Sequence, residues 1–296
     1  MDSDGLMEFE RHRPRLFALA YRMLGSASEA EDAVQESYLR WDATARDDIR
    51  SPEAWLTTVV VNQCRTWLDS ARARRETYVG PWLPEPVPTA HGELGPLESA
   101  EQRELVSIAF LTLLERLTAA ERAVFVLREA FGYAHKEIAD MLDLTEANSQ
   151  QLYRRAAQRV RMDRPRFDPA PAHARALLDK FLTAARSGDV AGLEAMFTSD
   201  ITSTADGGAN VRAARRAVEG ANKVARYLIW LFTHQVDGLE ITIEEVNGAP
   251  AIVARVHGTP ILVAAIETTN DLLHTLHLQV NPDKLALFRR AEAPGT

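Results

Sequence analysis

FGYAHKEIADMLDLTEANSQQLYRRAAQRVR, residues 131–161, predicts two short helices joined by a tight turn. The first helix has apolar residues at positions i, i+3 and i+4, which are Ile138, Met141 and Leu142. Asp143 and Leu144 interrupt the pattern, and Thr145 is a favourable N-cap for the second helix. This arrangement is typical of a helix-turn-helix, whose second helix enters the major groove of DNA.

The second helix of this pair has an apolar side and a polar side. The apolar side comprises Ser149, Leu152, Tyr153, Ala156 and Val160. Gln and Arg pair bidentately with adenine and guanine edges, so we predict that Gln150, Gln151 and Arg154 read bases. Arg155 and Arg159 flank this side and are predicted to contact phosphates. The full set of predicted DNA contacts here is Asn148, Gln150, Gln151, Arg154, Arg155 and Arg159.

The alternative interpretation of this stretch is an ordinary helical hairpin with a solvated polar face. The charge pattern argues against it. The bases between residues 150 and 166 are Arg154, Arg155, Arg159, Arg161, Arg164 and Arg166, and the one acid is Asp163. A solvated face normally mixes charges of both signs, so the one-sided run favours a polyanionic partner.

Composition sets limits on the remaining possibilities. A chain of 296 residues is long enough for two or three domains with their own cores. The single cysteine, Cys64, excludes an internal disulfide and a cysteine-based zinc site, and we expect no metal and no cofactor. The acidic start, MDSDGLMEFERHR, lacks the apolar core of a signal peptide, and no apolar run approaches membrane-spanning length. We therefore expect a cytoplasmic protein that does not bind membranes.

The net charge of −8 is unusual for a protein that binds DNA by itself. A free-standing repressor usually carries a basic excess that attracts phosphates. An acidic chain with one locally basic helix indicates that another protein brings it to DNA.

Proline-rich stretches divide the chain into domains. Residues 1–77 predict an all-helical domain, and residues 78–98, with five prolines, predict an extended linker. The helix-turn-helix domain is predicted at 99–162, a second linker at 163–172 and a last domain at 173–290.

The last domain is predicted to be α+β. Its helical patterns come first, and they include one predicted helix over RAVEGANKVARYLIWLF, residues 216–232. Four strand-like runs follow between residues 239 and 280, separated by hairpin signals at Asn247-Gly248 and at 258–260. This order favours an antiparallel sheet packed against helices.

Three segments, in this order, resemble the extracytoplasmic-function sigma factors of bacterial RNA polymerase: EDAVQESYLRW (31–41), SPEAWLTTVVVNQCRTWLDSARARR (51–75) and LTAAERAVFVLREAFGYAHKEIADML (117–142). The resemblance covers residues 6–162. It implies a sigma2-like domain that binds polymerase core and reads the −10 element, and a sigma4-like helix-turn-helix domain that reads the −35 element. Promoter DNA and RNA polymerase core would be the partners.

The resemblance assigns roles in the first domain. Asp32, Gln35 and Glu36 would face a basic coiled coil of the polymerase. On the −10-reading helix, Asn62 and Arg65 are the best polar candidates, with Arg72 and Arg74 for the DNA backbone. The loop at 44–50 is favoured over Trp55 and Trp67 for holding a flipped base, because a Trp on an apolar helix face is more often core. The acidic linker is compatible with the positively charged RNA-exit channel of polymerase.

The remainder of the chain resembles the SnoaL-like, or NTF2-like, cone domain that extends one subgroup of these sigma factors. Its markers are WLPEP at 82–86, Asp206-Gly207-Gly208, and NPDKL at 281–285. The resemblance implies a folded regulatory module with an unidentified small ligand as a possible addition. Its predicted contacts with the core of the protein are Trp82, Leu83, Pro84, Asp206, Asn281, Pro282, Asp283, Lys284 and Leu285.

Departures from the family pattern are Ala134 in place of a small polar N-cap, the pair Gln150 and Gln151 in the recognition helix, and Ala209 after the two glycines. Two other classes stay open. One is an autonomous helix-turn-helix regulator with a ligand-sensing domain. The other is a SnoaL-like cyclase or isomerase fused to a DNA-binding module, with candidate acid–base groups at Asp206, His234, His257, His274 and His277. No His–acid dyad stands out by spacing, and His274 and His277 would point to opposite faces of a strand.

Overall fold

A computed structural model describes residues 3–45, 49–76, 78–89, 92, 94, 99–163, 171–233 and 236–290. The chain forms two compact units. The first comprises Met1–Glu76, His91–Val106 and Phe110–Arg164, and the second comprises Thr77–Ala90, Ser107–Ala109 and Pro165–Thr296. Within these described ranges, no helix combines the length and the apolar character that crossing a membrane requires.

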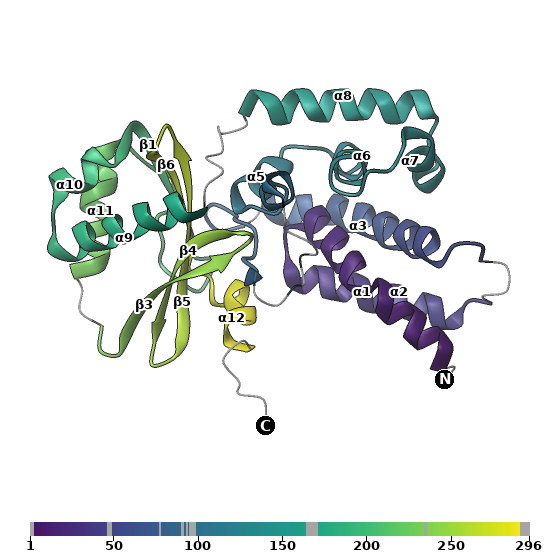
Figure 1. Ribbon diagram of the computed structural model, residues 1–296, viewed down its shortest axis with the longest axis horizontal. Coiled ribbons are helices and arrows are strands. Elements are labelled where there is room, and N and C mark those ends of the chain that lie inside the picture. The colour runs from purple at the N-terminus through teal and green to yellow at the C-terminus, as the bar shows by residue number, and fades with distance from the viewer. Residues whose placement is uncertain are drawn as a thin grey trace. The chain divides into compact units, whose positions relative to one another are not determined.

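The first unit begins with three long helices, α1 (Ser3–Leu24), α2 (Ala27–Ala43) and α3 (Pro52–Glu76), shown in Figure 1. Their starts follow the capping residues in the sequence. Ser26 accepts a hydrogen bond from the Glu29 N–H at 3.2 Å at the start of α2. The Ser51 hydroxyl accepts from the Ala54 N–H at 3.3 Å, so α3 starts at Pro52 as predicted.

Shorter helices complete the first unit: α4 (Ala100–Glu104), α5 (Ile108–Leu114), α6 (Ala119–Glu129), α7 (His135–Leu142) and α8 (Glu146–Asp163). Thr118 and Glu121 form the predicted capping box at the start of α6. Asp143 ends α7 in the left-handed conformation, at φ 54°, and the Thr145 hydroxyl accepts from the Asn148 N–H at 3.2 Å. The predicted helix-turn-helix is therefore confirmed as α7, a turn and α8.

Buried arginines connect the two helical groups inside the first unit. Arg122 on α6 is 1% exposed and donates to the Arg22 carbonyl oxygen at 3.1 Å, at the end of α1. Its guanidinium also pairs with Glu115 at 2.5 Å. Burial lowers the pKa of Arg122 to about 9, so the guanidinium stays charged at neutral pH and holds α6 against the first three helices.

The second unit is α+β, as predicted. Its elements are α9 (Pro171–Ser187), α10 (Val190–Ala195), β1 (Phe197–Asp206), β2 (Val218–Glu219), α11 (Ala221–Thr233), β3 (Leu239–Val246), β4 (Ala249–Val256), β5 (Thr259–Thr269), β6 (Leu272–Gln279), the 3-10 helix η3 (Pro282–Leu285) and α12 (Ala286–Arg290). The strand boundaries follow the period-two patterns and the Asn-Gly turn at 247–248.

The four predicted strands, β3 to β6, pair antiparallel as predicted. The described strands form one sheet in the order β2-β1-β6-β5-β4-β3, and the parallel pairing of β1 with β6, which the sequence did not predict, makes the whole sheet mixed. One detail of the sequence prediction is wrong. The segment 216–232 is not one helix. Val218 and Glu219 pair with β1, and the left-handed Gly220, at φ 92°, separates this strand from α11. Helical periodicity does not report a short strand next to a helix N-terminus.

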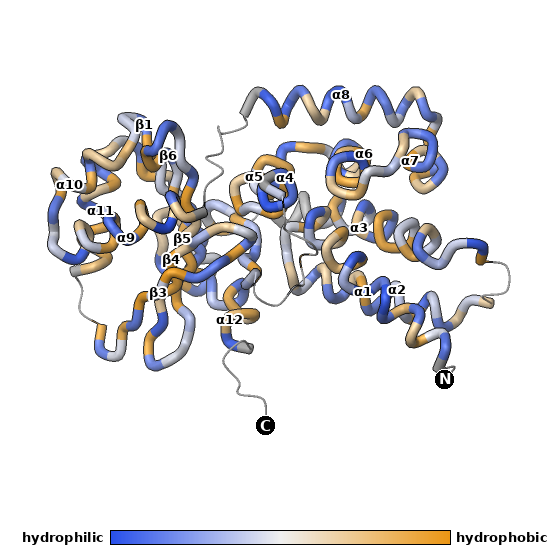
Figure 2. Tube along the Cα trace, in the orientation of Figure 1, coloured by the Kyte–Doolittle hydropathy of each residue, from blue (hydrophilic) through white to orange (hydrophobic). Residues whose placement is uncertain are grey.

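The two faces of the sheet have separate cores. Helices α9, α10 and α11 cover one face over Phe181, Leu228, Ile252, Ala264 and Leu276. The other face packs under η3 and α12, with Val253, Val263, Leu285 and Phe288. Alternate residues of β4 and β5 supply the two cores, as strand geometry requires, and Figure 2 shows how apolar these strands are.

Candidate functional site

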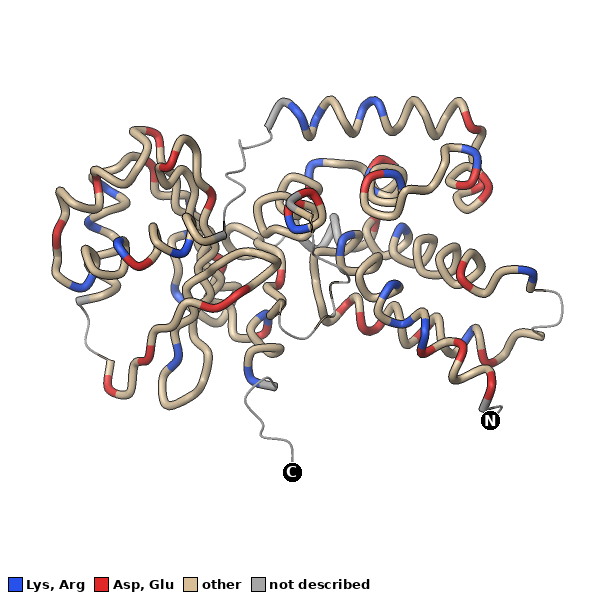
Figure 3. The backbone as a smooth tube through the Cα atoms, in the orientation of Figure 1, with Lys and Arg blue, Asp and Glu red and all other residues tan. Residues whose placement is uncertain are grey.

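Helix α8 presents most of its predicted base-reading side chains to solvent. Asn148, Gln151, Arg154 and Arg155 are exposed and Gln150 is half-buried, whereas the apolar side of α8 packs on α6 and α7 through Ala156 and Val160. Figure 3 shows that basic residues recur along α8. The free, Arg-bearing face has the form that major-groove contact requires.

Arg159, a predicted phosphate contact, already has an intramolecular partner. Its guanidinium lies 2.5 Å from Glu121 Oε2, with the Arg side chain 50% exposed and the Glu side chain 4% exposed. Glu121 is also the capping residue of α6. Arg159 therefore helps to anchor α8 on α6 and keeps only part of its surface for a phosphate.

A second contact anchors α8 to α7. His135 Nδ1 lies 3.0 Å from the Ser149 hydroxyl, which is buried on the apolar side of α8. Partial burial and the nearby Arg128 lower the pKa of His135, so the ring is neutral at pH 7. Ser149 thus has a polar partner at the centre of the helix-turn-helix, and the angle between its two helices is fixed there.

The predicted −10-reading residues on α3 have intramolecular partners on α7. Asn62 donates to the Met141 carbonyl oxygen at 2.9 Å, and Arg65 donates to the Leu142 carbonyl oxygen at 3.2 Å. These carbonyls lack helical partners because they belong to the last turn of α7. Asn62 and Arg65 therefore cap the first helix of the helix-turn-helix in this structure. Helix α3 continues through Arg72 and Arg74, whose side chains lie outside the described residues.

The aromatic candidates on α3 and the loop before it are placed differently from one another. Trp55 is half-buried and its ring lies 5.7 Å from that of the buried Trp41, which supports a core role for Trp55. Trp67 is half-buried as well. In the loop 44–50, residues 46–48 lie outside the described part of the chain.

Helix α2 exposes the predicted polymerase-binding face. Asp32 and Gln35 are exposed, and Glu36 is half-buried with Oε1 3.3 Å from Arg40. Leu39, one turn further on, is 57% exposed. The adjacent apolar and acidic groups form a continuous stripe along α2, with a composition suited to a protein partner.

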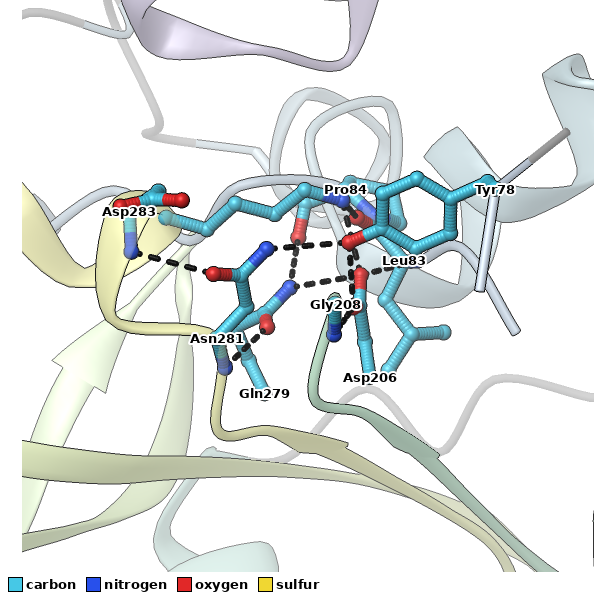
Figure 4. A network of polar contacts seen from close by, with 9 residues as sticks. Tyr78, Leu83, Pro84, Asp206, Gly208, Gln279, Asn281 and Asp283 are labelled. Carbon is cyan, nitrogen blue, oxygen red and sulfur yellow. Dashed lines mark hydrogen bonds and ion pairs between the residues drawn. The ribbon is translucent and has the colours of Figure 1, made fainter. Parts of the chain in front are cut away.

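In the second unit, Asp206 at the end of β1 collects the extended segment 78–89. Its buried carboxylate accepts from the Tyr78 hydroxyl at 2.7 Å, from the Leu83 N–H at 2.9 Å and from the Lys284 ammonium at 2.7 Å (Figure 4). Gln279 donates to the same carboxylate at 3.3 Å. Two of these donors lie in the segment and two in the C-terminal part of the same unit, so one buried charge joins them.

Lys284, on η3, secures the same stretch from a second side. Besides Asp206, it donates to the Leu83 carbonyl oxygen at 2.6 Å, and its ammonium lies 4.2 Å from the centre of the Trp82 ring. The Gln279 amide lies 3.4 Å from the Pro84 carbonyl oxygen. A cation stacked on an aromatic face and bonded to an adjacent carbonyl holds the chain in one orientation.

The remaining predicted residues of the NPDKL motif shape this region. Asn281 donates to the Tyr78 hydroxyl at 3.0 Å and accepts from the Asp283 N–H at 3.1 Å, while Pro282 starts η3. Leu285 is buried in the core below, and the exposed Asp283 carboxylate lies 3.4 Å from Asn210. Gly208 has φ 58°, and a Cβ atom there would come within 2.6 Å of the Asn281 amide, which explains a glycine at this position.

The far end of segment 78–89 binds to the β3–β4 turn. Val87 donates to the Asn247 side-chain oxygen at 2.8 Å and accepts from the Asn247 N–H at 2.9 Å. The Gly248 N–H donates to the Thr89 hydroxyl at 2.8 Å, and Pro88 forms a bridge with Val246. We call the groups that receive the segment the linker dock: Asp206, Asn247, Gly248, Gln279, Asn281 and Lys284.

Sequence reasoning identified half of this arrangement. It grouped Trp82, Leu83 and Pro84 with Asp206 and the NPDKL motif, and the structure brings these residues together. It missed Tyr78, Gln279 and Asn247. Asn247 and Gly248 were predicted only as a hairpin turn, although the turn leaves N–H groups that a neighbouring chain can use. Tyr78 gave no signal, because it lies in an otherwise proline-rich stretch.

Tyr78 is tuned to donate. Burial, followed by the hydrogen bond to Asp206 and the negative charge of that carboxylate, raises the pKa of the Tyr78 phenol. The phenol therefore keeps its proton at neutral pH and bridges Asp206 and Asn281.

The acid–base candidates of the enzyme alternative do not form a catalytic set among the described residues. Asp206 is occupied by the linker dock. His277 pairs with Glu267 at 2.5 Å on neighbouring strands, a dyad that spacing alone did not reveal. His274 lies 3.3 Å from Thr198, His257 adjoins Gly238, and His234 lies outside the described residues. A cavity of about 580 Å³ in the unit is lined by none of the four candidates that the structure describes.

Comparisons with known proteins match two regions of the chain to family models. A Sigma-70 region 2 family model matches residues 9–74, and a Sigma-70, region 4 model matches residues 107–160. The ECF RNA polymerase sigma factor SigJ of Mycobacterium tuberculosis is 38% identical over 234 residues, which are 78% of this chain and 74% of the relative.

Solved structures are similar as well. The crystal structure of Mycobacterium tuberculosis SigJ matches with a TM-score of 0.72 at 31% identity, over 95% of this chain and 98% of that one. An NTF2-like protein from Burkholderia xenovorans matches with a TM-score of 0.28 at 19% identity, over 40% of this chain and 95% of that one. The region 2 match covers most of α1, all of α2 and most of α3, and the region 4 match runs from α5 through the helix-turn-helix. This chain belongs to the extracytoplasmic-function sigma factors, which bind RNA polymerase core and direct it to promoters.

Proposed function

We propose that the second unit regulates promoter use by holding the chain that connects the two DNA-reading domains. The observation that supports this most strongly is the linker dock, in which Asp206 and Lys284 grip one end of segment 78–89 and Asn247 grips the other. The segment lies, in sequence, between the region 2 and region 4 matches. Docking therefore acts on the one connection that sets how far apart the two readers can move.

Chain length gives the size of this restriction. The whole 21-residue linker, 78–98, spans at most about 70 Å when extended, at about 3.3–3.6 Å per residue. With segment 78–89 docked, the nine residues 90–98 span at most about 30 Å. Docking therefore fixes twelve of the 21 linker residues and leaves nine free to change their span, so the dock selects which promoter spacings or polymerase-bound arrangements are accessible.

The reading roles follow the exposed faces. Gln150, Gln151 and Arg154 would contact bases of the −35 element, with Asn148, Arg155 and Arg159 near the DNA backbone. Asp32, Gln35 and Glu36 would contact the polymerase.

Asn62 and Arg65 would contact the −10 element with Arg72 and Arg74. Because Asn62 and Arg65 now cap α7, promoter reading requires α3 and α7 to separate. The free protein is in this respect closed, and polymerase would supply the binding energy that opens it. The site of action would be the cytoplasm, where polymerase and promoters are.

Transcription with purified components tests the proposal. Polymerase core would be combined with the full chain or with a chain that ends at Arg166, on one cognate promoter. We expect the shortened protein to bind core as tightly as the full chain and to give a different transcript yield. Equal yields would contradict a regulatory role for the second unit.

The alternative of an autonomous regulator has a separate test. The pure protein would be mixed with promoter duplex without polymerase. We expect affinity no greater than for unrelated duplex, because the chain has a net charge of −8. Sequence-specific binding by the pure protein would favour the autonomous regulator.

A further inference from the structure

The second unit has a partly open cavity of about 580 Å³, lined by residues of α9, α11, the sheet, η3 and α12. Apolar side chains dominate its walls, among them Phe181, Leu231, Ile252, Leu262 and Leu278. Its volume is in the range of sites that hold small organic ligands, about 300–1,000 Å³. The interior therefore suits an apolar ligand.

Both charged side chains among the described lining residues are arginines, and Thr259 adds a hydroxyl. Arg212, in the loop after β1, and Arg289, on α12, both line it and are both exposed, and Tyr227 adds a half-buried phenol. Burial raises the pKa of Tyr227, so this phenol is a hydrogen-bond donor at neutral pH. Among the described residues that line the cavity, none is Asp, Glu or His. The cavity offers donors and positive charge, which complement an anion.

Apolar side chains also surround its opening. Val211, Val236 and Ile261 line the cavity and are 38%, 47% and 40% exposed. Single exposed apolar residues are normal, but three around one opening indicate a route for an apolar molecule. An anionic group next to an apolar body satisfies both the arginines and these walls.

We infer that the cavity binds an apolar carboxylic acid of the medium-chain fatty acid type, with its tail inside and its carboxylate at Arg212 and Arg289. A neutral alcohol of the same length would make the same contacts with the apolar walls but would leave both guanidinium groups without a carboxylate. A cationic amine would be repelled by them.

The wall of the cavity is also the back of the linker dock. Ala205 lines the cavity and the next residue, Asp206, binds the linker. The same alternation occurs at Val280 and Asn281, and again at Leu285 and Lys284. A ligand that displaces this wall displaces the carboxylate and the ammonium that hold segment 78–89. Binding of the acid and docking of the linker are therefore coupled, and each must alter the other by the same factor. Whether this coupling regulates transcription rests on the proposed function of the linker dock. The binding of the acid does not rest on that proposed function.

Calorimetric titration of the full chain with dodecanoate, dodecanol and dodecylamine tests the binding. We expect dodecanoate to bind at least tenfold more tightly than dodecanol, and the double variant Arg212→Gln/Arg289→Gln to lose that preference. Ala264→Trp, which fills the cavity, should abolish binding of both, and Arg186→Gln, an exposed arginine outside the cavity, should change nothing. Equal affinities for the acid and the alcohol, or an unaffected double variant, would overturn the assignment of a carboxylate ligand.

Hydrogen exchange of segment 78–89 with and without dodecanoate tests the coupling. We expect a change in the exchange of the Leu83 and Val87 amides, which bond to the dock. The variant Asp206→Asn, which weakens docking, should raise dodecanoate affinity if dodecanoate speeds the exchange of these amides and lower it if dodecanoate slows their exchange. Binding without either effect would overturn the coupling and leave the ligand site intact. If the dock variants bind dodecanoate but give the same transcript yield as wild type, that result would instead contradict the proposed function alone.

Discussion

At the scale of single residues, Asp206 is the group on which the linker dock depends. Its carboxylate is fully buried, and the charge is balanced by Lys284, which is 13% exposed. Removing one member of a buried ion pair leaves the other charged and poorly solvated, at a cost of about 3–5 kcal/mol. The dock is therefore sensitive to changes at this one position that preserve the shape of the side chain.

We expect Asp206→Asn to release segment 78–89. The amide exchange of Leu83 should accelerate at least about a hundredfold, since about 2.7 kcal/mol corresponds to that factor. Asp283→Asn is the matched control, because its exposed carboxylate makes no hydrogen bond to the segment in the described structure. The double variant Asp206→Asn/Lys284→Met, which removes both charges, should recover part of the protection. Unchanged exchange in a folded Asp206→Asn protein would show that the ion pair does not hold the segment.

Tyr78 makes docking weaken at strongly alkaline pH. The docked phenol has a raised pKa, so its contribution to docking is complete below the ordinary tyrosine value of about 10 and declines as pH rises above it. A difference titration by ultraviolet absorbance, wild type minus Tyr78→Phe, should show one phenolate that forms well above pH 10. In Asp206→Asn the same difference should move toward the ordinary value. A Tyr78 phenol that ionises near pH 10 in both proteins would contradict the hydrogen bond to Asp206.

At the scale of elements, local chemistry predicted more than long-range pairing. Ser51, Thr118 and Thr145 predicted the starts of α3, α6 and α8, because a cap acts within one turn. The parallel pairing of β1 with β6 joins residues about seventy apart, and no local pattern reports it. The linker dock was partly predictable from the sequence. Its WLPEP and NPDKL motifs could be recognised, but the use of the Asn247 turn as a second grip depends on tertiary structure.

The roles proposed for α8 divide its exposed side chains into base readers and phosphate contacts. Gln151→Ala or Arg154→Ala should cost about 1–3 kcal/mol on the cognate −35 element and relax preference at one base pair. Arg155→Ala, on an adjacent exposed position, should weaken all −35 variants alike. Transcription from a panel of single-base −35 changes distinguishes the two patterns. Uniform losses for all three variants would mean that Gln151 and Arg154 contact only phosphates.

At the scale of the whole molecule, the proposed −10 roles of Asn62 and Arg65 require the first unit to change shape. Both side chains donate to α7 carbonyl oxygens, so on this proposal α3 and α7 separate when the protein binds polymerase and promoter. Arg122 adds to this closure by joining α6 to the end of α1. The sequence predicted both DNA-reading helices, α3 and α8. It could not show that α3 side chains would cap α7, the helix that precedes α8.

Spin labels on cysteines at Thr66 and Asp140, in a Cys64→Ala background, would measure this opening. Both positions are exposed, on α3 and α7, and Cys64 is the single native cysteine. We expect one short distance in the free protein and a longer distance after addition of polymerase core and promoter. The same short distance in the complete complex would exclude Asn62 and Arg65 as readers of the −10 element.

The link between docking and promoter use can be measured most directly by run-off transcription with an intact chain that cannot dock. Core polymerase would be supplied with wild type, Asp206→Asn or the control Asp283→Asn, at concentrations that saturate core binding. The transcript yield of Asp206→Asn should differ severalfold from that of the other two proteins, although all three bind core equally. If hydrogen exchange shows segment 78–89 released in Asp206→Asn and its yield still equals that of wild type, the linker dock does not regulate this sigma factor.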